Sequence, residues 1–354
     1  MNGAAPPARL NCGQMTSVQP QPVPSTRLEL GYDKHLMLFS GRANPELAAR
    51  IAGKLGVAPG PVTLKTFSNG EVYCKYGESI RGSDVFIVQP MCANPATGLT
   101  PNDALMELLL MIDAAVGASA HRVIAVTPWF GYSRQDKKSA PREPISARLV
   151  ARMIERAGAD RVLSMDLHAG QIQGFFSKPV DHMTALFILT QHFKDLGLHD
   201  LVVVAPDAGR VKLNKKFANK LGAELAILDK ERPAHQVAEI GHVIGDVRGR
   251  TAVIVDDIID TAGTLKVAGQ TVLDAGARAV YAAATHPVLS GNAFENLAAG
   301  GFEQIVVTDT IPLRAGAPEN IQVLSCADLL TDSIRSIFSD RSVSDVFGGE
   351  NQLF

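Results

Sequence analysis

Three observations predict an α/β fold built from two similar domains. The chain has 354 residues, which at average domain size corresponds to about two domains and a tail. From Lys34 onward, short and continuously apolar runs alternate with helical patterns, as in parallel strands that helices cover on both faces. Hydrophobic residues make up 46% and charged residues 20% of the chain, as in proteins with a sizeable core. We therefore expect two mainly parallel sheets, each flanked by helices.

Residues 1–33 form the first segment, which is rich in Pro, Gly, Gln and Ala and lacks periodic apolar spacing. Such a composition predicts a disordered leader. A translation start assigned too far upstream explains it equally well.

The first domain is expected over residues 34–180. It begins with an apolar strand at residues 36–39 and a helix over residues 45–55, for which Asn44 is a suitable N-cap. The further elements expected in this domain are the strands 85–88, 123–126 and 162–165 and the helices 104–116 and 145–157.

A break near Pro179 precedes a second series of elements, expected to form a domain over residues 181–320. Its expected helices are 184–193, 212–221 and 265–275, and its expected strands are 202–205, 226–228, 253–255, 280–284 and 305–308. We expect residues 321–354 to pack back on the first domain.

Charge and cysteine usage argue against several classes of protein. Lys+Arg 34 against Asp+Glu 36 leaves a net charge of −2, unlike a nucleic-acid or membrane-surface binder. The four cysteines lie far apart without paired metal spacing, so neither a disulfide scaffold nor a zinc module is expected. No apolar run reaches the roughly 18 residues that span a bilayer, and the N-terminus lacks the apolar core of a signal peptide. We expect a cytoplasmic enzyme.

The segment Thr251–Lys266 carries the clearest chemical signal. An apolar strand is expected to end at Asp256, and a turn of small residues, Thr261–Thr264, then opens a helix. Unpaired backbone N–H groups and the helix dipole at such a turn favour a phosphate. Carboxylates such as those of Asp256 and Asp257 accept hydrogen bonds from ribose hydroxyls, directly or through Mg²⁺. The segment therefore predicts a site for a phosphorylated sugar.

This segment resembles the phosphoribosyl-diphosphate (PRPP) motif that type I phosphoribosyltransferases share with PRPP synthetases, and alone it does not choose between them. Further segments are similar, in order, to class I ribose-phosphate diphosphokinases (PRPP synthetases), and phosphoribosyltransferases lack this set. They are Phe67–Glu71, Arg134–Lys138, Arg142–Ala147, Asp166–His168 with Gln171–Phe176, and Lys230–Pro233. The resemblance runs from Leu36 to Phe347 and implies two domains of the phosphoribosyltransferase type.

The resemblance implies a specific reaction. The β,γ-diphosphoryl group of ATP would pass to the C1 hydroxyl of ribose 5-phosphate, giving PRPP and AMP. This product would supply nucleotide, histidine and tryptophan biosynthesis. The implied partners are ATP, ribose 5-phosphate and further copies of this chain in a hexamer, with no nucleic acid and no membrane.

A hairpin is predicted around Asn69-Gly70, between two apolar segments, because both turn residues favour φ > 0. The resemblance implies that this hairpin binds ATP in the site of a neighbouring subunit. Phe67 would stack on adenine, with Asn69, Gly70 and Glu71 beside the nucleotide.

A cationic loop after a predicted strand is the second ATP-binding segment that the resemblance implies. Arg134 and Gln135 would bind the nucleotide, which suits the bidentate guanidinium of Arg134. Asp136 is a weaker candidate for the same site, and we expect it to orient Arg134.

Magnesium is the implied cofactor. Asp166 and His168 lie two residues apart at the end of a strand, so we expect their side chains to share a face. The resemblance implies that His168 and Asp207 bind Mg²⁺–ATP. Because imidazole is an unusual ligand for this hard ion, binding of His168 to a triphosphate oxygen remains the alternative.

Lys230 and Arg232 are the expected catalytic residues. The resemblance places both on a mobile loop that closes over the transferring group, where two cations would neutralise its oxygens and exclude water. Arg232 is also implied to bind ribose 5-phosphate. The other residues implied to bind this sugar phosphate are Asp256, Asp257, Asp260, Thr261, Ala262, Gly263 and Thr264.

The resemblance also implies phosphate activation and ADP inhibition. Four residues are similar to members of the family's allosteric site, namely Ser79, Arg81, Ser342 and Ser344.

Besides the leader, the chain departs from the family pattern at two places, and two other functions compete with the one implied. Residues 91–103 form a longer connection than usual, and Arg210 follows Gly209 where many members have a second glycine. Since only glycine adopts φ > 0 freely, the local backbone is expected to differ. A phosphoribosyltransferase would not need the ATP hairpin, Arg134 with Gln135, or Lys230 with Arg232. A non-catalytic regulatory partner would have lost catalytic groups, whereas all those expected are present here.

Overall fold

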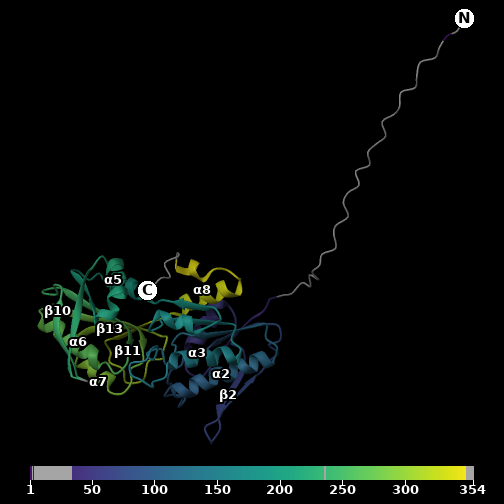
Figure 1. Cartoon of the computed structure of the whole chain (residues 1–354), viewed down its shortest axis with the longest axis horizontal. Coiled ribbons are helices and arrows are strands. Elements are labelled where there is room, and N and C mark those ends of the chain that lie inside the picture. Colours follow the sequence, from purple (N-terminus) through teal and green to yellow (C-terminus); the bar gives the residue numbers. More distant parts are fainter. Residues whose placement is uncertain (2, 4–33, 235–236, 348–354) are drawn as a thin grey trace. The chain divides into compact units, whose positions relative to one another are not determined.

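Two large sheets, which have one hydrophobic cluster in common, and a separate two-stranded hairpin make up the folded part of the chain in the computed structural model (Figure 1). The structure describes residues 34–234 and 237–347, together with Met1 and Gly3. Apart from these two residues, the leader expected over residues 1–33 lies outside the described part. None of the helices described combines the length and apolar character needed to cross a membrane.

The first sheet has five parallel strands in the order β1-β4-β5-β6-β7, which confirms the expected parallel α/β class. Its strands are β1 Leu36–Ser40, β4 Asp84–Val88, β5 Arg122–Thr127, β6 Arg161–Met165 and β7 Val180–Met183. Its helices are α1 Pro45–Leu55, α2 Pro101–Gly117 and α3 Ser146–Ala157. The Asn44 side chain caps α1 by accepting a hydrogen bond from the Leu47 N–H at 3.2 Å. The unpredicted β7 crosses the domain boundary that we expected at residue 180.

The predicted hairpin is present as β2 Val62–Thr66 and β3 Val72–Tyr76, which pair antiparallel and project from the body of the molecule (Figure 1). The expectation of positive φ at both Asn69 and Gly70 is wrong, because only Gly70 has it, at 91°. The strands are joined by a longer turn, in which the Gly70 N–H donates to the Phe67 carbonyl.

The second sheet has seven strands in the order β10-β9-β8-β11-β12-β13-β14, all parallel except for the antiparallel pair β9 and β10. Its strands are β8 Leu201–Ala205, β9 Glu224–Ala234, β10 Val237–Ile244, β11 Thr251–Ile259, β12 Ala279–Pro287, β13 Phe302–Thr308 and β14 Ile321–Leu324. The helices in this half are α4 Leu186–Asp195, α5 Val211–Leu221, α6 Gly263–Asp274 and α7 Ala293–Ala298. Three short 3₁₀ helices are η1 Gly170–Phe175, η2 Ala208–Arg210 and η3 Val343–Phe347.

Strand β11 does not end at Asp256 as predicted. It continues to Ile259 because Ile258 and Ile259 keep their parallel register with His286 and Pro287 of β12. The turn that follows therefore starts from a longer and more firmly held strand than the sequence pattern indicated.

Helix α8, Ala327–Phe338, packs against α1 of the first half. Lys54 of α1 forms an ion pair with Asp328 of α8, and Asp340 just beyond α8 forms ion pairs with Lys34 and Arg122. These contacts hold the C-terminal helix against the first sheet and its helices.

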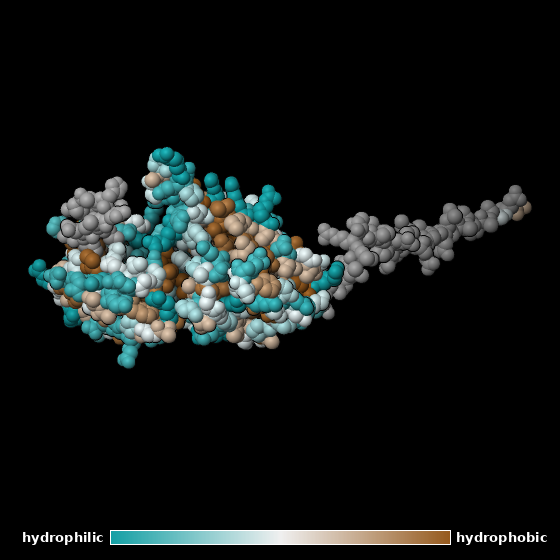
Figure 2. Space-filling view, turned by 90° about the horizontal axis from the view of Figure 1, so that it is seen from below, coloured by the Kyte–Doolittle hydropathy of each residue, from teal (hydrophilic) through white to brown (hydrophobic). Residues whose placement is uncertain are grey.

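One core cluster contains buried side chains from both sheets and from α8. Its members include Leu38 and Met165 of the first sheet, Val203 and Val253 of the second, and Leu330 of α8. The surface is mostly hydrophilic in the view from below, with separate hydrophobic patches (Figure 2). The exposed large hydrophobic side chains include Met106 and Val116 on α2 and Leu149 on α3.

Candidate active site

A cavity of 240 Å³ lies beside the carboxyl end of β11. In parallel α/β sheets this edge is the usual place for ligands. It brings together the predicted sugar-phosphate residues of β11 and the following turn with residues from three other segments. Its lining residues are Arg134, His168, Pro206, Asp207, Arg210, Asp256, Asp257, Ile258, Ile259, Asp260, Thr261, Ala262, Gly263, Thr264 and Leu265.

The turn before α6 has the backbone geometry of an anion site. Ala262 is left-handed, with φ 57° and ψ 8°, and the helix starts at the next residue, Gly263. Successive N–H groups in such a left-handed to helical transition converge on one point. Within the described residues, no side chain caps α6, and the Asn296 side chain supports the turn by donating to the Thr261 carbonyl at 2.8 Å. The turn is thus built to receive an anion from outside the chain.

Two adjacent carboxylates, those of Asp256 and Asp257, line the cavity opposite a cation. The guanidinium of Arg210 lies 3.3 Å from Oδ1 of Asp256 and 2.7 Å from Oδ1 of Asp257. Nδ1 of His168 lies 2.8 Å from Oδ2 of Asp257. Only 5% of the Asp257 side chain is exposed, against 32% for Asp256.

The two carboxyl groups differ in how readily they ionise. Burial opposes ionisation of Asp257, but the hydrogen bond from His168 and the charge of Arg210 outweigh it and lower its pKa well below the ordinary value. For Asp256, burial of the carboxyl group in the site and repulsion from Asp257 raise the pKa. Asp257 is therefore the more acidic member of the pair.

Arg134 reaches the cavity from the loop after β5. Its Nη1 donates to Oδ2 of Asp260 at 2.6 Å, and the other oxygen of Asp260 accepts a hydrogen bond from Ser290. The expectation that Asp136 orients Arg134 does not agree with this geometry, because the buried carboxylate of Asp136 accepts a hydrogen bond from Gln171 instead.

Gln135 lies beside Arg134 but lines a different cavity of 630 Å³, which also includes Arg134. Oε1 of Gln135 accepts a hydrogen bond from the Ser146 hydroxyl at 2.5 Å. Six residues of the long 91–103 segment also line this larger cavity, namely Met91, Cys92, Ala93, Pro95, Pro101 and Asn102. The longer connection therefore shapes a space next to the predicted ATP residues.

Asp166 and His168 do not share a face, contrary to the expectation from strand alternation. Asp166 lies just after β6 with φ 32°, a left-handed conformation that breaks the alternation. Its buried carboxylate accepts hydrogen bonds from the Ala185 N–H at 2.9 Å and the Thr285 hydroxyl at 2.6 Å. Only His168 lines the cavity.

The donor atoms of His168 and Asp207 are compatible with a cation that arrives with a nucleotide. Both residues line the cavity, at the ends of β6 and β8. In the part of the chain that the structure describes, no group of three or more His, Cys, Asp or Glu residues could hold a metal ion. Mg²⁺ usually takes one or two carboxylates and completes its shell with substrate phosphates and water. The carboxylate of Asp207 fits that mode of binding, with His168 lining the same cavity.

The predicted adenine-binding hairpin stands apart from this cavity. Phe67 is 44% exposed, and its ring contacts Tyr73 edge-on at 5.8 Å and lies under the ammonium group of Lys65 at 4.9 Å. The Asn69 side chain accepts a hydrogen bond from the Glu71 N–H at 3.1 Å. Neither these residues nor Gly70 are among the cavity's described lining residues.

The backbone at Lys230 and Arg232 belongs to a strand, not to a loop. Both residues lie in β9, and Lys230 is in register with Ile240 of β10. The side chains of residues 230–241 lie outside the described part of the structure. The strand prediction for residues 226–228 was therefore too short, since β9 extends to Ala234 in an antiparallel hairpin.

The four predicted regulatory residues are all on the surface. Ser79 and Arg81 are exposed on either side of the buried Ile80. Ser342 and Ser344 are exposed, with their hydroxyl oxygens 2.5 Å apart.

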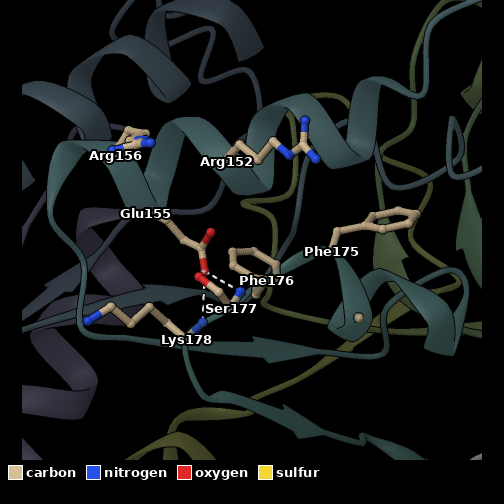
Figure 3. Close-up of a pocket in the computed structure, with 8 residues that line it drawn as sticks. Arg152, Glu155, Arg156, Phe175, Phe176, Ser177 and Lys178 are labelled. Carbon is tan, nitrogen blue, oxygen red and sulfur yellow. Dashed lines mark hydrogen bonds between the residues drawn. The ribbon is translucent and has the colours of Figure 1, made fainter.

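A further cavity, of 720 Å³ and with a cationic lining, was not predicted from the sequence (Figure 3). Arg152, Arg156 and Lys178 line it, and the carboxylate of Glu155 points to the turn at Ser177 (Figure 3). That carboxylate accepts hydrogen bonds from the Ser177 hydroxyl at 2.9 Å and the Lys178 N–H at 2.8 Å. Its negative charge is thus used to hold the turn.

Arg210 is the site residue whose role sequence reasoning missed. The pattern marked it only as an arginine after Gly209, with an altered backbone expected. The backbone at Arg210 is ordinary, with φ −97° and ψ −1°, so no glycine is required there. Its proximity to an aspartate pair 46 residues away follows from the fold, because β8 and β11 are paired neighbours.

Three features meet at the carboxyl edge of this mainly parallel sheet: an anion-binding turn, an acidic pair and a cation. Together they define an enzyme that acts on a phosphorylated sugar. The family model described as the N-terminal domain of ribose phosphate pyrophosphokinase matches residues 36–158. The phosphoribosyl synthetase-associated domain matches residues 234–348.

Individual relatives agree with these matches. The chain is 50% identical to a ribose-phosphate pyrophosphokinase of Gloeobacter violaceus, over 89% of this chain and 94% of the relative. It is 47% identical to that of Chlorobaculum tepidum, over 89% and 96%. The crystal structure of phosphoribosylpyrophosphate synthetase from Mycobacterium smegmatis matches with a TM-score of 0.81 and 45% identity, over 87% of this chain and 100% of that one. This chain belongs to the ribose-phosphate pyrophosphokinase family.

Proposed function

We propose that this chain transfers the diphosphoryl group of ATP to the C1 hydroxyl of ribose 5-phosphate, forming PRPP and AMP. The observation that carries the proposal is the meeting, in one cavity, of an uncapped helix turn with two carboxylates. A ligand with a phosphate at one end and hydroxyls at the other would satisfy both groups. Family membership supports the same substrate.

The sugar phosphate would bind along β11 and its turn. The N–H groups of residues 262–264 and the Thr264 hydroxyl would hold the 5-phosphate, while Asp256 and Asp257 would accept hydrogen bonds from ribose hydroxyls. Asp257 is the more acidic of the two and is held by both Arg210 and His168, so it would make the stronger of these hydrogen bonds. The C1 hydroxyl would thus be fixed for attack on the β-phosphorus.

The nucleotide would approach from the side of Arg134, which already touches the turn through Asp260. We propose that Arg134, Gln135 and Asp136 bind ATP. Mg²⁺ held by His168 and Asp207 together with the triphosphate would supply charge neutralisation. We further propose that Lys230 and Arg232 neutralise the transferring group and that Arg232 also contacts the sugar phosphate.

We propose that the active unit is a homo-oligomer, a hexamer as the family resemblance implies. Two features support an assembly: the exposed Phe67 ring on the projecting hairpin and the exposed apolar side chains of Met106, Val116 and Leu149. In this proposal Phe67, Asn69, Gly70 and Glu71 complete the ATP site of a neighbouring copy. Ser79, Arg81, Ser342 and Ser344 would bind regulatory phosphate or ADP in the cytoplasm.

A coupled assay tests the function directly. AMP should form from Mg²⁺–ATP only when ribose 5-phosphate is present, with PRPP formed in equal amount. The proposal fails if AMP forms without the sugar or if no AMP forms at all. A phosphoribosyltransferase would instead consume PRPP in the presence of a base and release diphosphate.

A further inference from the structure

Arg210 connects three groups that come from separate parts of the chain. It follows β8 and precedes α5, whereas His168 follows β6 of the first sheet and the aspartate pair lies on β11 of the second. Its Nε and Nη2 face Asp256 and Asp257 at 3.3 and 2.7 Å, and its Nη1 donates to the His168 carbonyl at 3.3 Å. Only 17% of its side chain is exposed.

The His168 ring adds a further contact to this cluster. Nδ1 lies 2.8 Å from Oδ2 of Asp257 and also 2.7 Å from Nη2 of Arg210. One ring nitrogen cannot both donate to a carboxylate and accept from a guanidinium. The tautomer therefore decides which contact is a hydrogen bond, and in either case the ring is held between these two side chains.

The guanidinium of Arg210 offsets the repulsion between two neighbouring carboxylates. Two carboxylates on consecutive residues repel each other, and without a cation they would separate or take up a proton. A planar guanidinium with several donors can hold both at once, which a single ammonium group does less well. The cavity is therefore ordered before a ligand enters, and an ordered site loses less free energy on binding.

We propose that Arg210 is a positioning residue for ribose 5-phosphate, whose guanidinium holds the carboxylates of Asp256 and Asp257 side by side and fixes His168 next to them before the sugar binds. This inference rests on the proposed function for the identity of the ligand. It assigns a role in binding to a position outside the residues that the family motif identifies.

The test is ribose 5-phosphate binding, measured by calorimetry without nucleotide, in the parent protein and in Arg210→Ala. The backbone at position 210 is compatible with alanine, since its φ is −97°. We expect the Kd for ribose 5-phosphate to rise about tenfold or more, because hydrogen bonds to charged groups are lost. In turnover, the KM for ribose 5-phosphate should rise by a larger factor than kcat falls, while the KM for ATP changes less than about threefold.

Chemical rescue separates positioning from folding. Guanidinium chloride at tens of millimolar should restore sugar binding in Arg210→Ala more than sodium chloride does at equal ionic strength. Arg210→Lys should recover only part of the lost affinity. Arg250→Ala is the matched control. Arg250 pairs with the exposed Glu224 away from the cavity, so this variant should bind the sugar as the parent protein does.

The outcomes distinguish the inference from the function on which it rests. A Kd for Arg210→Ala within about threefold of the parent, an equal loss of ATP use, or rescue by sodium chloride as effective as by guanidinium would each overturn the role of Arg210 alone. A parent protein that binds no ribose 5-phosphate would overturn the proposed function and this inference with it.

Discussion

The sugar-phosphate cavity and the tip of the β2–β3 hairpin are held in place in opposite ways. In the cavity, Asp257, Asp260 and Thr261 each make a hydrogen bond or ion pair with a side chain from another segment of the chain. At the hairpin tip, Phe67 contacts Lys65 and Tyr73 of its own hairpin, and Asn69 bonds the Glu71 N–H two residues away.

This difference indicates how the two regions act. A cavity with long-range internal contacts is shaped by the chain that contains it, and it can bind a small molecule alone. A projecting tip whose contacts, within the described part of the chain, come from its own hairpin presents its side chains to something outside its own fold. We therefore expect single substitutions in the cavity to impair binding within the same chain. Substitutions at the hairpin tip should instead impair the site of a neighbouring copy.

The largest loss of activity is expected on substitution of Lys230. This residue lies in β9, which is part of neither the β2–β3 hairpin nor the described lining of the cavity. If it stabilises the transition state, Lys230→Ala should lower kcat by about 10²–10³, with little change in ATP affinity. Lys230→Arg should rescue poorly, because a guanidinium does not reproduce a compact ammonium group. Single-turnover AMP formation and calorimetry of nucleotide binding measure the two quantities. Near-normal turnover would show that Lys230 has no catalytic role.

Asp257→Asn tests the cavity itself. The substitution keeps the shape but removes the charge that Arg210 and His168 hold, so the KM for ribose 5-phosphate should rise about tenfold to a hundredfold. The KM for ATP should change far less, because the carboxylate faces the sugar. Asp274→Asn, on the exposed surface of α6, is the control. An effect confined to ATP would contradict the assignment of β11 to the sugar.

Thr264→Val removes one hydroxyl from the phosphate-binding turn. We expect weaker ribose 5-phosphate binding by about 1–3 kcal/mol, the range for a hydrogen bond to a charged group. The remaining backbone N–H groups of the turn should keep the site functional. Comparing inorganic phosphate with ribose 5-phosphate as competing ligands would check this, since both should weaken together. If only the sugar weakened, Thr264 would contact a hydroxyl instead of the phosphate.

Mixing two inactive variants tests whether the hairpin acts on a neighbour. A Phe67→Ala/Glu71→Ala double variant and Lys230→Ala each damage a different half of the proposed site. In oligomers reassembled at equal ratio, about a quarter of the sites would combine two intact halves. Activity should return to about that fraction after reassembly. Absence of activity in demonstrably mixed oligomers would mean that each site is built within one chain.

Asp84→Asn should leave both regions unaffected while lowering stability. Burial opposes ionisation of Asp84, but hydrogen bonds from Arg122 and His121 outweigh it and lower its pKa. A lowered folded-state pKa gives stability that is present above the unfolded value of about 4 and is lost as pH falls further.

The expected result is a loss of about 1–3 kcal/mol at pH 7 in Asp84→Asn, a loss that shrinks as the pH falls below 4. Urea unfolding across that pH range measures it, with kcat unchanged within about twofold. Asp332→Asn, at an exposed ion pair of α8, should show no such pH dependence. A constant difference at every pH would argue for lost packing instead of lost charge.

Helices and strands were predictable wherever one continuous or periodic pattern of apolar residues marked the whole element. Buried strands such as β4 and β8 are continuous apolar runs, and α1 has its cap and N-terminal proline in the sequence. Strands β7 and β10 were missed because mixed polar and apolar residues give no clear run. Strand β11 was cut short at Asp256 because two acidic residues interrupt its pattern, although pairing with β12 continues.

The site was predictable for residues that lie next to one another in the sequence. The turn at residues 261–264 and the aspartate pair are contiguous, so their chemistry is visible before folding. Contacts that depend on tertiary structure were not visible. Arg210 beside Asp257, and Asp136 beside Gln171 instead of Arg134, follow from which strands are neighbours.

The core that both sheets share has a mechanical consequence. Since Leu38 and Met165 belong to the same cluster as Val203, Val253 and Leu330, swinging one half against the other would open buried apolar contacts. Such a frame leaves motion to the projecting β2–β3 hairpin. Motion during turnover would then be measured as a change in mobility at this hairpin, with the distance between the halves constant.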